Sequence, residues 1–443
     1  MFKKHVTLSV VLGLLAAAAA GCGGTDKENG AGSGAADAGG GKATDTIDKP
    51  VTIDITDAGG TTADQLDALF GNAIRKKFPN VTINYKLTNK EIRLENLITA
   101  GENIDIYTRS IGSFFNEVPV FKFQYDLSAM VKTYGLDLNR IEPSLIDSMK
   151  NNADGQLWGL PVFNTNLVLY YNKDIFDKFG VAYPKDGMTW PQIYDTAKKL
   201  NRTENGVTYV GLALSGQHQI KLNSLGMPYV DAKTGLSTYD DEKWKKIFEP
   251  LYVPAEDPGY RSFMAAKGDK VADSQDFYDS KAAMLGTIQH HAGNANFAKA
   301  GFNWDMASYP TYPDSPDVGS QSYPTYFAIP SFAKNKDDAF KIIKYLLSDE
   351  FQTEASKAGN MTVLKNPDIQ KAYGTNAYKG KNLQAAFHNK FAPVMRKTPY
   401  DADVEKAATQ HIVNLATGKI DINTALRQAK DQADKKIAEL KAK

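Results

Sequence analysis

The sequence predicts an α/β protein with a parallel sheet, and three observations lead to this prediction. Early in the chain, segments of alternating apolar and polar residues take turns with segments of helical spacing. A second region with strand-like and helical segments follows in the middle of the chain. With 443 residues, of which 42% are hydrophobic and 11% aromatic, the chain is long enough for two domains of typical size.

The first region opens with a strand, because three aliphatic residues between 51 and 55 alternate with polar ones. Two glycines end this strand, and Thr62 followed by Gln65 has the form of a capping box at a helix start. The expected elements are a strand at 51–56, a helix at 63–78, a strand at 81–85, a helix at 91–100 and a short buried strand at 104–107. Ligands of such sheets bind outside the carboxyl ends of the strands, so residues 57–61 and 107–110 are candidates for a site.

The middle region is also α/β. The expected strands are 167–171 and 209–214, and the expected helices are 174–179, a helix that opens at Thr189 and an amphipathic helix at about 339–347. Pro191 is tolerated because it falls in a first helical turn. A polar loop, 215–218, follows the second of these strands. We find no repeat of 20–50 residues, which argues against a solenoid.

Charge and cysteine counts exclude several classes of protein. Lys plus Arg is 52 and Asp plus Glu is 51, so the formal net charge is +1 and no global field attracts a nucleic-acid backbone. The 22 Tyr, 21 Phe and 4 Trp residues exclude disorder of the whole chain. Cys22 is the one cysteine, which excludes an intramolecular disulfide and a cysteine-based metal cage.

The N-terminus has the composition of a signal peptide. Lys3 and Lys4 precede an uncharged, mostly apolar run at 6–20, which is too short for a comfortable membrane span. Small residues lead from this run into Cys22. One interpretation is a plain secretory peptide in which Cys22 is incidental. The interpretation we favour is a bacterial lipoprotein signal at 1–21, which the segment resembles, with cleavage before Cys22 and lipidation of its thiol.

Residues 22–50 are expected to form the lipid anchor and a disordered linker. Eight glycines and five alanines fall within 23–50, together with no aromatic residue. Such a segment buries too little surface to offset its chain entropy. As a flexible chain it would hold the folded part roughly 30 Å from the anchor. The folded part is then expected to begin near Val51.

We find no motif for catalysis, a metal or a cofactor. The G-x-S-x-G, G-x-x-x-x-G-K-[ST], G-x-G-x-x-G and H-E-x-x-H patterns are all absent. His290 and His291 are adjacent, so on a regular element they point apart and make a poor metal pair. Paired carboxylates for glycosidic chemistry remain open, because spacing along the sequence does not give spacing in space. We expect no catalytic residue, no metal and no cofactor.

Six blocks of the chain together resemble one protein family. They are residues 100–106 (AGENIDI), 154–174 (DGQLWGLPV and LYYNKD), 189–192 (TWPQ), 280–284 (SKAAM), 328–347 (AIP and the helix after it) and 418–426. In this order they are similar to blocks of the extracellular solute-binding proteins, family 1, the capture subunits of ABC importers. That family includes maltose-binding protein, and the resemblance covers essentially all of 51–443.

The resemblance implies the two-lobe periplasmic-binding-protein-like fold, in which two α/β lobes are joined by hinge strands. The first lobe would hold 51–164 plus 328–390, and the second 169–322 plus 396–443. A ligand would bind in the cleft, and the lobes would close over it by a hinge motion. The implied partners are a small-molecule solute, expected to be an oligosaccharide, and the membrane permease subunits of an ABC importer with a separate ATPase. No nucleic acid is implied, and the protein is expected to be a monomer, anchored outside the cytoplasm to the cell membrane through lipidated Cys22.

Candidate ligand contacts follow from the strand ends and from the resemblance together. They are Gly59, Gly60, Thr61, Tyr107, Arg109, Asn164, Thr165, Ser215, Gln217, Gln289 and His290. Glycine backbone lets a ligand approach closely, and the planar fork of Arg109 suits hydroxyls or a carboxylate, although a surface salt bridge is the alternative role. His290 falls where similar sugar binders carry the tryptophan of a Gly-x-Trp element, which suggests a more polar contact.

Three other functions stay open from the sequence. The ligand could be another polar solute, such as a peptide, a polyamine or a phosphorylated compound. The absence of a dense cluster of one charge at the expected loops argues against strongly charged ligands. A surface glycoside hydrolase would need two converging carboxylates, and Asp57 is the one acid in the loops named above. An adhesin or a sensor would have the same fold but no permease partner.

Overall fold

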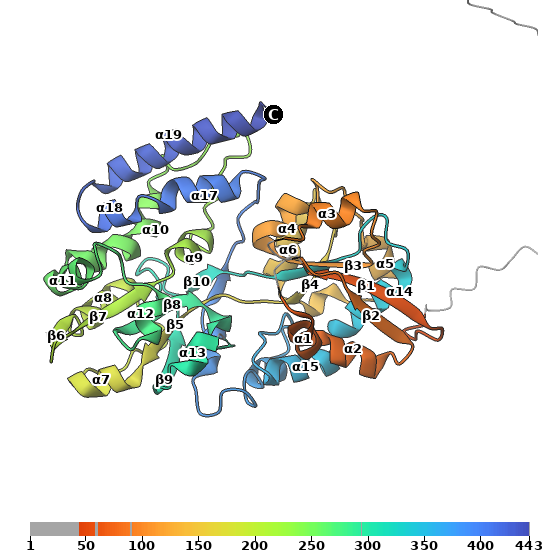
Figure 1. The fold of residues 1–443 in the computed structure, drawn as a ribbon, viewed down its shortest axis with the longest axis horizontal. Helices are drawn as coiled ribbons and strands as arrows, with labels where there is room; N and C mark the ends of the chain where they lie inside the picture. The colour runs from red at the N-terminus through yellow and green to blue at the C-terminus, as the bar shows by residue number, and fades with distance from the viewer. Residues whose placement is uncertain (1–43, 58–60, 89–90, 294, 443) are drawn as a thin grey trace, which may run out of the picture. The chain divides into compact units, whose positions relative to one another are not determined.

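The computed structural model describes residues 44–57, 61–88, 91–293 and 295–442. Two five-stranded sheets dominate it, and Figure 1 shows the strands of each sheet gathered with their own set of helices. The predicted α/β fold is confirmed. The expected signal peptide, Cys22, Gly59 and Gly60 lie outside the described residues.

The first sheet begins with the parallel strands that the alternation predicts. In sheet order its strands are β2 (Val81–Tyr85), β1 (Val51–Asp57), β3 (Ile106–Ser110), β11 (Thr325–Ala328) and β4 (Leu160–Phe163). β1 pairs in parallel with both β2 and β3, and β11 runs antiparallel to its neighbours β3 and β4. Asp57 is the register partner of Thr108, so the carboxyl ends of β1 and β3 lie side by side.

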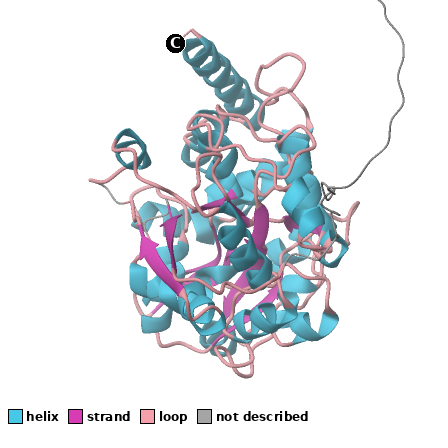
Figure 2. Ribbon diagram, turned by 90° about the vertical axis from the view of Figure 1, so that its right-hand side faces the viewer, coloured by secondary structure: helices cyan, strands magenta, loops and turns pink. Residues whose placement is uncertain are grey.

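Helices pack around this sheet, and the first of them starts at the predicted capping box, in which Thr62 and Gln65 bond reciprocally. Its middle widens into a π turn, η1, where Gly71 passes close to the Tyr85 hydroxyl. Figure 2 views the molecule from the side of the first sheet and shows helices surrounding the strands there. The helices of this part are α1 (Ala63–Leu66), η1 (Asp67–Gly71), α2 (Asn72–Lys77), α3 (Leu94–Thr99), α4 (Ile111–Glu117), α5 (Ser128–Thr133), η2 (Leu138–Arg140), α6 (Pro143–Asn152), α14 (Lys336–Leu346), α15 (Asp349–Lys357) and α16 (Pro367–Lys371).

The second sheet is mixed. In sheet order its strands are β6 (Arg202–Glu204), β7 (Val207–Leu214), β8 (Ala282–Ile288), β5 (Leu167–Asn172) and β9 (Trp304–Ser308). β7 and β8 are parallel, and β5 runs antiparallel to both β8 and β9. Every residue of β5 and β8 is buried, which explains why these segments read as continuous apolar runs.

The helices around the second sheet include the second predicted capping box, where Thr189 and Gln192 bond reciprocally. These helices are α7 (Lys173–Phe179), α8 (Trp190–Lys198), α9 (Gly216–Lys221), α10 (Lys243–Tyr252), η3 (Val253–Glu256), α11 (Pro258–Ala266), α12 (Ser274–Tyr278), η4 (Gln289–Gly293), α13 (Ala295–Lys299), η5 (Leu383–Phe387), α17 (Asp401–Thr409), α18 (Ile412–Ala416) and α19 (Ile422–Lys441).

Buried side chains form one cluster around the first sheet and three around the second. Ile47 belongs to the first cluster, so ordered packing begins four residues before the expected start at Val51. The physical reason is that Ile47 is the one large aliphatic residue of the expected linker and finds an apolar site. Tyr373 and Leu383 pack in a cluster of the second sheet. The lobe boundaries expected from the sequence stay a prediction.

Two short strands, β10 (Val318–Gln321) and β12 (Lys390–Ala392), pair in parallel beside the passages of chain that run between the sheets. The Ser320 hydroxyl of β10 accepts a hydrogen bond from the backbone N–H of Leu167, the first residue of β5. These contacts bring distant parts of the chain next to the strand ends where the site lies.

Candidate functional site

A cavity of about 500 Å³ is lined by residues that follow strands of both sheets. The lining comes from the ends of β1, β3 and β4, from α1 and η1, from β11, from the residues after β8, and from two passages of chain near 323 and 360. Its lining residues are Asp57, Thr61, Leu66, Leu69, Phe70, Thr108, Arg109, Ser110, Phe163, Asn164, Thr165, Gln289, His290, Tyr323, Thr325, Phe327, Gly359, Asn360 and Met361.

Asp57 organises the edge of the cavity at the first sheet. Its Oδ1 accepts a hydrogen bond from the Thr108 hydroxyl at 3.1 Å, and its Oδ2 accepts one from the backbone N–H of Thr61 at 3.3 Å. The carboxylate is therefore held by the end of the neighbouring strand and by Thr61, just before α1. This is the place that the strand-end rule predicts for a site in a sheet of parallel strands.

Arg109 is held in the cavity wall by Glu117, the last residue of α4. The Nε and Nη2 atoms of Arg109 both donate to Oε1 of Glu117, at 3.2 and 2.8 Å. Burial disfavours the charged guanidinium, but the carboxylate outweighs it, so the pKa of Arg109 lies above its ordinary value. The hydroxyl of Tyr107 donates to the other oxygen, Oε2, of Glu117.

Asn164 and Thr165 lie just after β4, where the chain passes toward the second sheet. Both side chains are buried, and Oδ1 of Asn164 accepts a hydrogen bond from the backbone N–H of Tyr323. Within the described chain, the Thr165 hydroxyl has no hydrogen-bond partner, although it is 95% buried. An unpaired buried hydroxyl is costly, so this atom is a candidate for bonding a ligand.

Gln289 and His290 come directly after β8. Gln289 is 1% exposed, and its Oε1 is a second buried polar atom without a hydrogen-bond partner among the described residues. The side chain of His290 is exposed to the cavity. Surrounding protein and the neighbouring His291 lower the pKa of His290 below its ordinary value, so the imidazole is neutral near pH 7.

The structure brings together six of the residues predicted from the sequence to contact a ligand. They are Thr61, Arg109, Asn164, Thr165, Gln289 and His290. Tyr107 does not line the cavity, because it is fully buried and its hydroxyl donates to Glu117. Sequence reasoning missed Phe163, Tyr323 and Met361, which no motif or strand-end rule marks.

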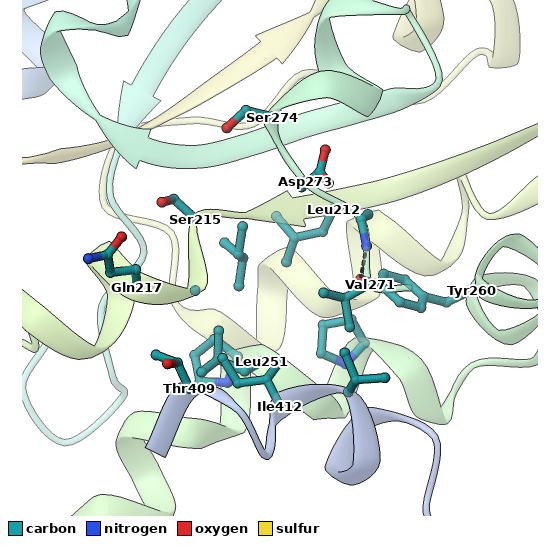
Figure 3. Close-up of a pocket in the computed structure, with 16 residues that line it drawn as sticks. Leu212, Ser215, Gln217, Leu251, Tyr260, Val271, Asp273, Ser274, Thr409 and Ile412 are labelled. Atoms are coloured by element: carbon teal, nitrogen blue, oxygen red, sulfur yellow. Dashed lines mark hydrogen bonds between the residues drawn. The ribbon is translucent and has the colours of Figure 1, made fainter. Parts of the chain in front are cut away.

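Ser215 and Gln217 line a separate cavity of about 340 Å³ in the second sheet region. Figure 3 shows them on one side of it and Tyr260 on the other, where the Tyr260 hydroxyl accepts a hydrogen bond from the backbone N–H of Ala272 at 3.2 Å. Most other lining side chains, such as Leu251, are apolar. Ser215 Oγ lies 2.6 Å from Nδ1 of His218, in the first turns of α9.

Residues 59–353 match the family described as bacterial extracellular solute-binding protein. The chain belongs to this family. As a member of an extracellular family, this solute-binding protein acts outside the cytoplasm. The recognition made from the six sequence blocks is thereby confirmed.

Relatives of this solute-binding protein span most of its length. A Brucella abortus (strain 2308) protein, whose name specifies binding but no ligand, is 23% identical over 386 residues and covers 82% of this chain and 87% of its own length. The sn-glycerol-3-phosphate-binding periplasmic protein of Rhizobium meliloti (strain 1021) is 23% identical over 337 residues, covering 69% of this chain and 73% of its own.

A solved structure of a sugar transporter from Rhizobium etli, in an open conformation, superposes with a TM-score of 0.69 at 22% identity. It covers 86% of this chain and 99% of that one. A substrate-binding protein from Listeria monocytogenes in complex with cycloalternan superposes with a TM-score of 0.68 at 19% identity, covering 87% and 99%. These likenesses confirm the predicted two-lobe fold of periplasmic binding proteins.

The described residues contain neither a cluster of metal ligands nor a helix that could span a membrane. No group of three or more His, Cys, Asp or Glu side chains there is placed to hold a metal ion. Of the helices in the same residues, none combines the length and apolar character needed to cross a membrane.

Proposed function

We propose that the protein captures an uncharged carbohydrate in the 500 Å³ cavity and delivers it to the permease of an ABC importer. The observation that carries this proposal is the pair of unpaired buried polar atoms, Oε1 of Gln289 and Oγ1 of Thr165, on the cavity wall. Hydroxyl groups of a sugar would satisfy both atoms. Phe70, Phe163 and Tyr323 supply apolar faces in the same wall, which suit the carbon side of a sugar ring.

Charge in the cavity supports a neutral ligand. Among its described lining residues, Asp57 and Arg109 carry the charges and none is lysine. Glu117 further compensates Arg109. An anionic solute would therefore meet no excess of positive charge.

Several similar solved structures are of oligosaccharide-binding proteins, which supports this ligand class. They include complexes with cycloalternan, mannotriose and acarbose, and a binding protein for cyclic α-maltosyl-1,6-maltose. The alternative is another polar solute, and the relatives named for binding sn-glycerol 3-phosphate favour a phosphorylated one. A glycoside hydrolase is less well supported, because it needs two flanking carboxylates and Asp57 is the one acid in the described lining. We accordingly infer a binding protein without turnover.

The proposed site consists of the six predicted residues that line the cavity together with Asp57. Ser215 and Gln217 line the separate cavity of about 340 Å³ and stay predicted contacts. We propose that Cys22 carries the lipid anchor, that the signal peptide ends at residue 21, and that the mature protein is a monomer at the outer side of the cell membrane. Replacing Cys22 by alanine would then release the folded protein from the membrane fraction, whereas continued retention would contradict the anchor.

A thermal-shift panel of neutral oligosaccharides and sn-glycerol 3-phosphate tests the ligand class, because a solute that binds only the folded state raises Tm. The matched variants are Gln289→Met and the exposed control Gln384→Met. Gln289→Met removes an unpaired buried oxygen, so the unliganded protein should be at least as stable while affinity for the sugar falls about tenfold. The proposal would be contradicted if only sn-glycerol 3-phosphate raised Tm. It would also be contradicted if Gln289→Met bound the sugar as tightly as the parent.

A further inference from the structure

The Arg109–Glu117 pair separates two cavities. Arg109 lines both the proposed sugar cavity and a neighbouring cavity of about 400 Å³, and Glu117 lines only the second. The guanidinium therefore forms part of the wall that a ligand would meet, with the carboxylate directly behind it. Their closest atoms, Nη2 and Oε1, are 2.8 Å apart.

Helix stability does not explain the position of Glu117. It is the last residue of α4, and the carbonyl end of a helix disfavours a negative side chain. Its carboxylate is instead occupied by two groups of β3: Arg109 bonds Oε1 through Nε and Nη2, and the Tyr107 hydroxyl bonds Oε2. About a quarter of the Glu117 side chain is exposed, so the pair is partly shielded from water.

This arrangement changes the charge that a ligand would encounter. Arginine stays protonated under all ordinary conditions, so a guanidinium in a ligand cavity attracts phosphate or carboxylate groups unless an acid compensates it. Glu117 is that acid, and it lies on the side of Arg109 that faces the second cavity. Asp57, which lines the same cavity as Arg109, adds a second negative charge to the wall.

We propose that Glu117 is a positioning residue that makes the cavity reject anionic solutes, by orienting Arg109 and compensating its charge. This inference rests on the proposed function, because it assumes that the cavity is the solute site. It assigns the choice between neutral sugars and phosphorylated solutes to one residue outside the cavity.

The decisive variant is Glu117→Gln, because the amide keeps an oxygen that can accept from Arg109 while the charge is removed. Calorimetry would measure binding of sn-glycerol 3-phosphate and of the neutral sugar that stabilises the parent most. We expect Glu117→Gln to bind sn-glycerol 3-phosphate about five- to tenfold more tightly than the parent, with the gain shrinking as salt is added. Affinity for the neutral sugar should change less than threefold.

Two further variants separate charge from structure. Glu117→Asp should restore the rejection of sn-glycerol 3-phosphate, and Tyr107→Phe should leave it unchanged because the compensating carboxylate remains. The inference is wrong if Glu117→Gln gains no affinity for sn-glycerol 3-phosphate, including the case in which neither protein binds it, or if the gain does not depend on salt. A parent that binds no neutral sugar would instead contradict the proposed function.

Discussion

Asn164 accepts a hydrogen bond at Oδ1 from the backbone N–H of Tyr323, at 3.2 Å. The same N–H lies 2.8 Å from the carbonyl oxygen of Thr165, and the backbone N–H of Asn164 donates to the carbonyl of Met361 at 3.3 Å. Three stretches of chain that are far apart in sequence are thus tied together at the cavity. Segments tied in this way keep their spacing, so relative motion of the two sheet regions is expected to be bending about them.

Asn164→Ala tests the role of this connection. The change removes an acceptor from a buried side chain, and we expect the free energy of unfolding to fall by about 1 kcal/mol. Sugar affinity should fall as well, because Asn164 lines the cavity. Urea denaturation and calorimetry measure the two effects. Asn84→Ala, which removes a hydrogen bond of an exposed side chain to Asp54, is the control. Unchanged stability and affinity in Asn164→Ala would show that the connection does not matter.

Local patterns predicted three of the five strands of the first sheet, β1, β2 and β3, and the capping box that starts its first helix. They did not predict β4 and β11. The strand expected at 104–107 begins two residues later, as β3 (Ile106–Ser110), because Asp105 bonds to another part of the chain. The Asp105 carboxylate is fully buried and accepts hydrogen bonds from the backbone N–H groups of Lys334 and Asn335. The start of β3 thus depends on hydrogen-bond partners more than 200 residues away, which no local sequence pattern can reveal.

Local sequence patterns also predicted only part of the candidate site. The strand-end rule found Thr61 and Arg109, because it depends only on where parallel strands stop. It placed Tyr107 in the site as well, yet Tyr107 lies two residues earlier on the same face of β3 and therefore sits one layer deeper. Phe163 and Met361 meet in the cavity through long-range folding, which their neighbours in sequence do not reveal.

His218 should make the protein sensitive to acid. Burial, with the charge of Lys221 and the nearby His290 and His291, lowers the pKa of His218 to about 4. Between pH 6.5 and pH 4, the His218 imidazole is therefore protonated in the unfolded chain but stays neutral in the folded chain. The stability that His218 contributes is complete above pH 6.5 and is lost as the pH falls toward 4.

When the pH falls from 7 to 4.5, we expect the free energy of unfolding of His218→Asn to decrease by about 1–2 kcal/mol less than that of the parent. Chemical denaturation at a series of pH values measures this difference. His388→Asn, at an exposed histidine, controls for the removal of one imidazole. Parallel pH profiles for the parent and His218→Asn would contradict the assignment.

Gly211 sets the distance between β7 and α8. A Cβ at this position would overlap the backbone of Ala197, lying 2.6 Å from its carbonyl carbon. Because the clash is with backbone, Gly211→Ala should destabilise the fold by about 2–3 kcal/mol. At Gly216 a Cβ would meet only the flexible side-chain ends of Ile412 and Leu251, so Gly216→Ala is the matched control. Thermal denaturation that ranks the two variants equally would contradict this account.

The last prediction concerns closure. Arg109 belongs to the first sheet region and His290 follows a strand of the second, yet both line one cavity. A sugar that touches both binds the closed arrangement better than the open one, and this difference in affinity is what would drive closure. Small-angle scattering should therefore show the radius of gyration falling when the sugar identified in the thermal panel is added to the parent.

Arg109→Ala and His290→Ala should each weaken the response at the same sugar concentration. Neither side chain is fully buried, so the unliganded fold should stay nearly as stable as the parent, although Arg109→Ala leaves Glu117 without its main partner. Glu117→Gln with Arg109→Ala removes that unpaired charge and keeps the test valid if the single variant folds poorly. An unchanged radius in the parent at saturating sugar would rule out the clamp, because a ligand that contacts both regions without drawing them together would have no preference between the two arrangements.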